Sequence, residues 1–189
     1  MSKRCISCLI GLGSNLGRGS INSVDIIASS ICSLNRYGAC IYKISKFYRT
    51  PAVPCGSGPD FINAAVLISI ARCPENILQI LHKTEQENFR ERSRRWAPRT
   101  LDLDLLAVGN IISPNHRTFK YWMNLSRERQ LSEAPEMLIL PHPRLHERAF
   151  VLGPLLDIVP NWFHPILKKS VSEMFYELPA KAREEIRPV

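Results

Sequence analysis

The alternation of apolar and polar positions divides the chain into strands and helices. Short segments rich in β-branched and aromatic residues predict strands at 5–10, 41–50, 61–71 and 101–108. Apolar residues recur at helical spacing in 21–34 and 74–85, which predicts a helix in each segment. Ser20 can cap the first helix, and the spacing turns His82 and Glu85 outward near the end of the second. The resulting order is strand, helix, strand, strand, helix, strand. This order predicts an α+β fold with a ferredoxin-like βαββαβ core.

The second half of the chain adds further elements to this core. Residues 113–136 are polar and basic around the pair Tyr121-Trp122, and we interpret them as an insertion. A solvated excursion is favoured there over a nucleic-acid patch, because single-strand binders repeat aromatic platforms along a basic groove. The apolar segment 149–160 predicts a helix that closes the core, and 170–186 predicts a terminal helix interrupted near Pro179.

We therefore expect a single domain over 1–189 in an α/β/α three-layer arrangement. Residues 166–189 would form a C-terminal extension that contributes an additional strand and helices.

The segment from Arg95 to Asp104 carries the densest chemistry of the chain. Strand alternation turns Leu101, Leu103 and Leu105 to a core, whereas Asp102 and Asp104 share the opposite face. Two adjacent carboxylates suit Mg²⁺ bound together with phosphates, although an isolated Asp-x-Asp is more often a solvated strand edge. Five nearby arginines favour the metal site, because guanidinium groups bind polyphosphate. They are Arg90, Arg92, Arg94, Arg95 and Arg99.

Three other features of the first half deserve interpretation. The spacing of Gly11, Gly13 and Gly17 misses a dinucleotide-binding fingerprint by one residue, which favours a strand-to-helix turn. The proline- and glycine-rich segment 51–59 predicts a long loop of the kind that often carries function. Asn63 is polar within an apolar strand, so it must either have a structural partner or hydrogen-bond a ligand.

Composition narrows the class of protein. The chain has 189 residues, of which 45% are hydrophobic and 22% charged, as in ordinary globular domains. No apolar run approaches the roughly 20 residues that a membrane span needs, so we expect a cytoplasmic protein with no membrane partner. Its six cysteines are predicted to be reduced and mostly buried. The net charge of +8 favours an anionic partner.

Several separated segments together resemble the 6-hydroxymethyl-7,8-dihydropterin pyrophosphokinase family of folate biosynthesis. The matching residues are Gly13-Ser14-Asn15, Phe47 to Pro51, Pro59 to Ala64, Glu85, Arg90-x-Arg92, Arg95 to Asp104, Pro141-His142 and Arg148-x-Phe150. The resemblance runs from about residue 5 to residue 165. It implies a monomeric, ferredoxin-like enzyme that transfers diphosphate from ATP to the hydroxymethyl group of the pterin and releases AMP.

The resemblance also assigns site residues. Asp102 and Asp104 would hold two Mg²⁺ ions, and with Arg90 and Arg92 they form the catalytic set. The substrate-binding set would be Thr50, Pro51, Val53, Phe61, Asn63, Trp96 and Phe150, with the two phenylalanines on either side of the pterin. The nucleotide-binding set would be Glu85, Arg92, Trp96, Arg99, His142 and Arg148. Fusion to, or association with, other enzymes of the folate pathway is a further implication.

The chain departs from the family pattern in the loops, at Ala52, Phe89 and Ala97, and also near the nucleotide. Met137, Ile139 and Pro143 replace an arginine, a threonine and a tyrosine of some members. The insertion precedes this edge, and it either supplies the missing contacts or only shields them.

Two other functions agree less well with the sequence. An RNA-binding module would carry exposed aromatics in a Lys/Arg-Gly-Phe-x-Phe type segment, which the chain lacks, so no nucleic-acid partner is expected. A catalytically silent interaction domain would have no need of the Asp pair and the loop arginines.

Overall fold

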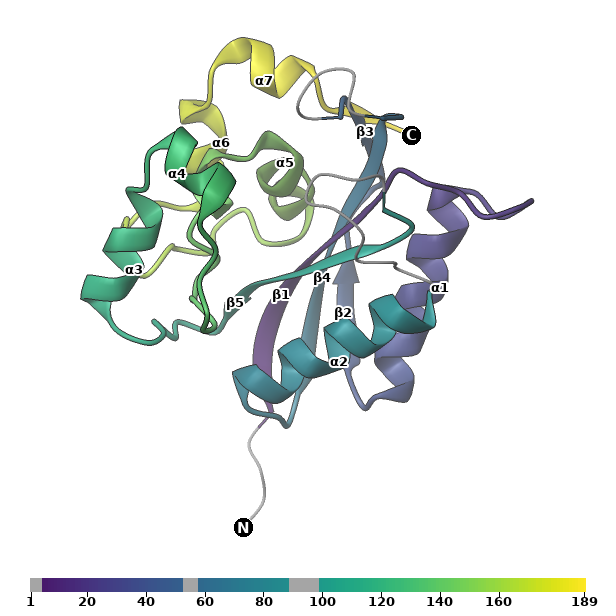
Figure 1. Cartoon of the computed structure of the whole chain (residues 1–189), viewed down its shortest axis with the longest axis horizontal. Helices are drawn as coiled ribbons and strands as arrows, with labels where there is room; N and C mark the ends of the chain where they lie inside the picture. Colours follow the sequence, from purple (N-terminus) through teal and green to yellow (C-terminus); the bar gives the residue numbers. More distant parts are fainter. Residues whose placement is uncertain (1–4, 53–57, 89–98) are drawn as a thin grey trace.

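The protein is built on one antiparallel sheet, whose strands differ in length, with helices on both faces (Figure 1). The computed structural model describes residues 5–52, 58–88 and 99–189. The core elements are β1 (Ile6–Ser14), α1 (Ser23–Arg36), β2 (Cys40–Ile44), β3 (Tyr48–Thr50), β4 (Phe61–Ile70), α2 (Pro74–Glu87) and β5 (Asp102–Val108). The elements that follow are α3 (His116–Met123), α4 (Arg127–Ser132), a 3₁₀ turn (Leu145–Glu147), α5 (Ala149–Ile158), α6 (Val171–Glu177), α7 (Ala180–Glu184) and β6 (Arg187–Pro188).

The sheet has the ferredoxin-like strand order. Its hydrogen-bonded order is β5-β1-β4-β3-β6, and β2 pairs with β4 ahead of β3. All pairings are antiparallel. If β2 and β3 are counted as one interrupted strand, the order along the chain is the predicted βαββαβ, so the predicted fold class is confirmed.

Helices cover both faces of the sheet and bury two separate cores. On one face α1 and α2 pack on a core that includes Ile10, Val66 and Leu103. On the other face α5 and α6 cover a smaller core that includes Leu9, Ala65 and Leu106. Figure 1 shows the two helical layers on opposite sides of the strands. The central strands β1 and β4 are thus apolar on both faces, as the sequence indicated for β4.

Three local predictions were wrong. Gly11 and Gly13 lie inside β1 and not in a turn, because their positions in the sheet face the large side chains of neighbouring strands. The predicted strand 41–50 is broken at Ser45, whose hydroxyl accepts a hydrogen bond from Ala65 N at 2.9 Å where the strand pairing is interrupted. The cap of α1 is Asn22, not Ser20, because the Asn22 side chain accepts from Asp25 N.

The insertion is an ordered helical excursion. Its two ends meet in a pair of backbone hydrogen bonds of 3.0 and 3.1 Å between Ser113 and Leu140. Phe119 of α3 is fully buried and its ring lies 5.6 Å from that of His164. The aromatic residue that holds the excursion is therefore Phe119, whereas Tyr121 of the Tyr121-Trp122 pair is exposed.

The C-terminal segment returns to the sheet. A capping box formed by Ser170 and Glu173 begins α6, and Pro179 separates α6 from α7 where the sequence predicted the interruption. The short strand β6 then pairs with β3, so the last residues extend the sheet beside Tyr48 and Arg49. The additional C-terminal strand and helices are present as predicted.

Candidate active site

The two carboxylates of β5 lie on the sheet face that α5 covers, opposite the α1/α2 core. Leu101, Leu103 and Leu105 are buried, and the side chains between them, Asp102 and Asp104, keep 23% and 38% of their surface exposed. Strand alternation therefore produces the shared acidic face that the sequence predicted. The β1 residues opposite the pair are Gly13 and Gly11, which have no side chains to cover the carboxylates.

Each carboxylate lies near an arginine that the sequence assigned to the nucleotide. Arg99 donates from Nη1 to Asp102 Oδ2 at 2.5 Å, and Arg148 Nη1 lies 3.8 Å from Asp104 Oδ2. Burial lowers the pKa of Arg148, and the neighbouring Asp104 opposes that shift. The acidic pair is thus neutralised by cations in this structure, which is the electrostatic condition that a metal and its phosphates would also satisfy.

The donor set fits a hard cation that keeps open positions. Within 5–52, 58–88 and 99–189, no three His, Cys, Asp or Glu side chains gather as a metal-binding group. Two carboxylates with exposed oxygens are nevertheless what Mg²⁺ uses when substrate phosphates complete its coordination. Asp102 and Asp104 suit such a site, and a closed all-protein metal site is not found among those residues.

A row of residues connects the acidic pair to the predicted pterin site. The cross-strand partner of Asp102 is Gly13, and the partner of Gly13 on its other side is Asn63. A Cβ added at Gly13 would lie 3.1 Å from Asn63 Oδ1 and 3.9 Å from Asp102 Cβ. Gly13 is therefore the floor of the space between the amide and the carboxylates, a role that its place in a glycine-rich motif did not reveal.

Asn63 has a structural partner and also faces this space. The side chain is only 5% exposed, and its Nδ2 donates to Thr50 Oγ1 at 2.8 Å. No described residue donates a hydrogen bond to Oδ1. The structural partner of Asn63 does not exclude a ligand contact, because an amide whose nitrogen is hydrogen-bonded to the protein can still present its oxygen to a ligand.

The two phenylalanines begin elements that pack against each other. Phe61 is the first residue of β4 and Phe150 lies in the first turn of α5, and both are half-buried. The guanidinium of Arg148 lies 5.6 Å from the centre of the Phe150 ring. Arg148 is therefore brought close to both a metal-site carboxylate and a predicted pterin contact.

Glu85 lies in a different environment from the one expected. We interpreted it as an outward-facing residue of α2, but it is only 1% exposed, and its Oε1 accepts from Leu103 N at 2.7 Å. This bond anchors the outer edge of β5 between the two aspartates. A direct contact of Glu85 with the nucleotide stays a prediction.

His142 is held as a neutral imidazole beside β5. Burial, together with the nearby charges of Arg148 and Arg144, lowers its pKa to about 3. Its backbone N donates to Leu106 O at 2.7 Å, and its Nδ1 accepts from Arg144 N. The segment that follows the insertion is thereby fixed along the free edge of the Asp strand.

Some predicted site residues cannot be placed. Val53, Arg90, Arg92 and Trp96 lie outside the described residues. Pro51 is described, exposed, and directly follows β3. The described members come from β3, β4, α2, β5 and α5 or their ends, apart from His142, which lies in the loop before the 3₁₀ turn. The sheet brings Thr50, Asn63 and Asp102 to one end of the same face.

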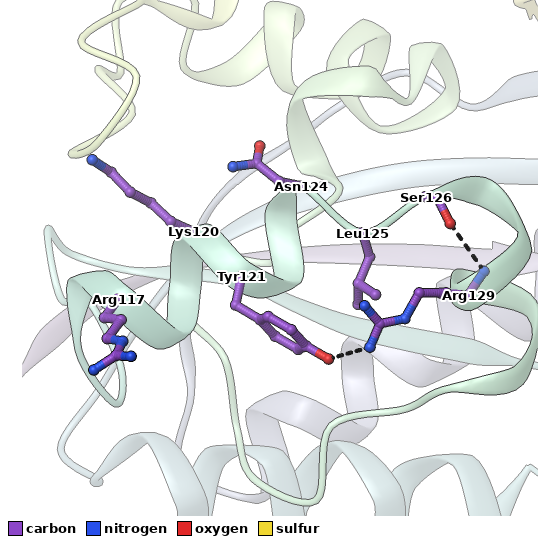
Figure 2. A pocket seen from close by; sticks show the side chains of 7 residues that line it. All are labelled: Arg117, Lys120, Tyr121, Asn124, Leu125, Ser126 and Arg129. Carbon is purple, nitrogen blue, oxygen red and sulfur yellow. Dashed lines mark hydrogen bonds between the residues drawn. The ribbon is translucent and has the colours of Figure 1, made fainter.

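The insertion carries a hollow of its own. Its volume is about 490 Å³, and it is lined by Arg117, Lys120, Tyr121, Asn124, Leu125, Ser126 and Arg129 (Figure 2). The Arg129 guanidinium contacts Tyr121 Oη at 2.6 Å and Glu133 at 2.6 Å, so that charge is already paired. None of the residues assigned to substrates or metal lines this hollow.

Comparison with known proteins identifies the family. The family model described as 7,8-dihydro-6-hydroxymethylpterin-pyrophosphokinase matches residues 9–160. The chain belongs to this family. The pyrophosphokinase of Synechocystis is 30% identical over 192 residues, covering 98% of this chain and 83% of that protein. The pyrophosphokinase of Bacillus subtilis is 33% identical over 150 residues, covering 79% of this chain and 75% of that protein. The predicted resemblance is confirmed.

Solved structures of the pyrophosphokinase family share the fold. A Plasmodium falciparum HPPK-DHPS structure superposes with a TM-score of 0.65 at 14% identity, covering 93% of this chain. The chain spans 44% of that longer protein. In Arabidopsis, a relative named as a folate synthesis bifunctional protein is 33% identical over 151 residues, which are 23% of its length. Pyrophosphokinase domains thus occur both alone and within longer proteins.

Proposed function

We propose that this chain transfers diphosphate from ATP to the hydroxymethyl group of 6-hydroxymethyl-7,8-dihydropterin, giving AMP and the pterin diphosphate. Membership of the pyrophosphokinase family supports the reaction and its place in folate biosynthesis. The observation that carries the proposal is the row Asp102, Gly13, Asn63 across β5, β1 and β4. This row brings a carboxylate pair and the Asn63 amide to one face, with no side chain between them.

On the phosphate side, Asp102 and Asp104 would hold Mg²⁺. Bound there, the metal would neutralise the phosphate oxygens and help to align them for in-line transfer. Arg99 is hydrogen-bonded to Asp102 and Arg148 lies 3.8 Å from Asp104, and their guanidinium groups are suited to bind phosphate oxygens once a metal replaces them at the aspartates. We propose that the two aspartates hold two Mg²⁺ ions and not one.

On the pterin side, Asn63 would hydrogen-bond the ring while Thr50 holds the amide in place. The 2.8 Å bond from Asn63 Nδ2 to Thr50 Oγ1 fixes the orientation of the amide before substrate binds. Phe61 and Phe150 would contact the two faces of the ring, because half-buried aromatic side chains provide flat apolar walls.

The reaction needs little covalent help from the protein. Phosphoryl-group transfer is accelerated mainly by alignment and charge neutralisation, and the described site supplies rigid strands for the first and cations for the second. A base is not required among the site residues, and His142, with a pKa lowered to about 3, stays neutral at physiological pH.

A monomeric state and a cytoplasmic location are further parts of the proposal. The described cysteines are free thiols, as a reducing compartment would keep them, although only Cys8 is buried and the prediction of mostly buried cysteines was wrong. Within the described residues, no helix combines the length and apolar character needed to cross a bilayer. Association with another folate-pathway enzyme is supported only by the longer relatives.

Product analysis tests the proposal. The protein is incubated with ATP, Mg²⁺ and 6-hydroxymethyl-7,8-dihydropterin, and nucleotides and pterins are separated by ion-exchange chromatography. We expect equal amounts of AMP and pterin diphosphate. ADP with a pterin monophosphate, or an unchanged pterin, would contradict the diphosphate transfer.

A further inference from the structure

The side chain of Asn15 joins the two chain segments that lead into the site. It lies just after β1, is 5% exposed, and makes one hydrogen bond with each segment. Its Nδ2 donates to Pro59 O at 3.1 Å, two residues before Phe61. Its Oδ1 accepts from Arg99 N at 2.8 Å, three residues before Asp102. One amide therefore spans residues that are 44 and 84 positions away in the chain.

The two contacts are not equally replaceable. The Arg99 peptide is also held by the backbone, because its carbonyl accepts from Asn15 N at 3.1 Å and from Leu16 N at 3.2 Å. The Pro59 contact runs through the Asn15 amide alone among the described residues. Loss of the Nδ2 donor would thus free the Pro59 side while the Arg99 side stays attached.

Each anchored segment positions a different substrate group. Pro59 leads into Phe61, which we assign to the pterin, and Arg99 leads into the Arg99–Asp102 ion pair, which we assign to the phosphates and metal. Asn15 itself extends from β1, the strand between the two. The amide is therefore placed to fix the separation between the pterin wall and the phosphate wall.

We propose that Asn15 is a positioning residue that sets the alignment of the pterin hydroxymethyl group with the triphosphate. It contacts the two walls and neither reacting atom. The inference rests on the proposed diphosphate transfer. Its distinctive consequence is that loss of the amide lowers the turnover of bound substrates more than it lowers the affinity for each substrate alone, since in-line transfer depends on the relative position of two groups.

Two variants and a control test this role. Asn15→Ala removes both side-chain contacts. Asn15→Asp keeps an acceptor for Arg99 N but loses the donor to Pro59 O and places a carboxylate against that carbonyl. Asn35→Ala changes an exposed asparagine of α1 far from the site and serves as the matched control.

We expect kcat to fall about 10- to 100-fold in both Asn15 variants, as a misplacement of around 1 Å produces. Dissociation constants for the pterin alone and for a non-hydrolysable ATP analogue alone should change by less than about threefold, which is under 1 kcal/mol. The Asn35 variant should behave as the wild type.

Three results would overturn the proposal. The first is unchanged turnover in Asn15→Ala, and the second is normal turnover in Asn15→Asp when turnover in Asn15→Ala is reduced. The third is a loss of substrate affinity or of folded structure in proportion to the loss of turnover, because that would show that Asn15 serves only the fold. Failure of the parent reaction is distinguished by the wild-type protein, which would then form no AMP.

Discussion

Gly13→Ala tests whether the space between Asn63 and Asp102 must stay free of side chains. The added Cβ would lie 3.1 Å from Asn63 Oδ1 and 3.7 Å from the Phe61 ring, so the amide must shift by a few tenths of an ångström. Gly11→Ala is the matched control on the same strand. The three atoms nearest to its Cβ would all belong to the Leu106 side chain, at an ordinary 3.4 to 3.6 Å.

The two substitutions should differ in stability. Replacing glycine within a strand gains roughly 0.5–1 kcal/mol of backbone entropy at either position. Overpacking at Gly13 offsets that gain, because insertion of a methyl group into a packed site costs about 1–3 kcal/mol. We expect Gly11→Ala to be neutral or slightly stabilising and Gly13→Ala to lose about 1 kcal/mol, which lowers Tm by around 2–4 °C in a domain of this size.

They should differ more in ligand binding. The displaced Asn63 amide is expected to lose much of one neutral hydrogen bond to the pterin, worth about 0.5–1.5 kcal/mol, or roughly 2- to 12-fold in Kd. Fluorescence titration with the pterin, on variants whose melting has been measured, gives this value. Equal pterin affinity in Gly13→Ala and Gly11→Ala would refute the assignment of Gly13 as the floor of the site.

Three further predictions address other parts of the structure. Burial lowers the pKa of His164 to about 4, so the unfolded chain takes up a proton at this residue at a higher pH than the folded protein does. The free energy of unfolding should therefore fall by up to roughly 1.4 kcal/mol per pH unit as the pH drops from about 6.5 to about 4. His164→Asn can still accept hydrogen bonds from the turn at 166–167 and should reduce this slope in urea melts, and an identical slope would contradict the assignment. Glu85→Ala should lower the free energy of unfolding by about 1–3 kcal/mol in the same assay, because Leu103 N loses its buried side-chain acceptor. Glu85→Gln keeps an acceptor oxygen and should cost less than about 1 kcal/mol, and equal losses in the two variants would show that the bond to Leu103 N does not matter. The double variant Arg117→Ala/Lys120→Ala should leave the KM for ATP unchanged. Asp102 lies at the start of β5, and α3 comes after the other end of this strand, roughly 20 Å away. A raised KM would indicate that the insertion supplies nucleotide contacts.

The sequence predicted most where one physical rule dominated. Alternation alone placed Asp102 and Asp104 on one face, and helical periodicity gave α1 and α2 nearly their observed lengths. The break in the predicted strand 41–50 was missed because it depends on Ser45 bonding to Ala65 of another strand, which no local pattern encodes.

The same limit applied to the site. Gly13 was assigned to a turn because glycine is common in turns, whereas its reason is the crowding by Asn63 and Phe61 from β4. Glu85 was expected to face solvent because its helical spacing turned it away from the packed residues of α2, and its bond to Leu103 N on the edge strand β5 explains its burial. Residues whose role depends on a distant partner could be named from family resemblance but not explained by it.

Whether Asp102 and Asp104 together hold the metal at the triphosphate can be measured directly. Mn²⁺ can replace Mg²⁺ as a spectroscopic probe, and electron paramagnetic resonance titration in the presence of a non-hydrolysable ATP analogue counts the bound ions. We expect the wild type to bind two Mn²⁺ per chain. Asp102→Ala and Asp104→Ala should each weaken Mn²⁺ binding by at least tenfold. Each should also slow AMP formation by an amount that corresponds to a loss of several kcal/mol of transition-state stabilisation, and the double variant should be little slower than the slower single variant. The free energy of unfolding of these variants should change by only about 1 kcal/mol, because the Arg99–Asp102 ion pair is partly exposed. Near-normal Mn²⁺ binding and AMP formation in both single variants would contradict the account.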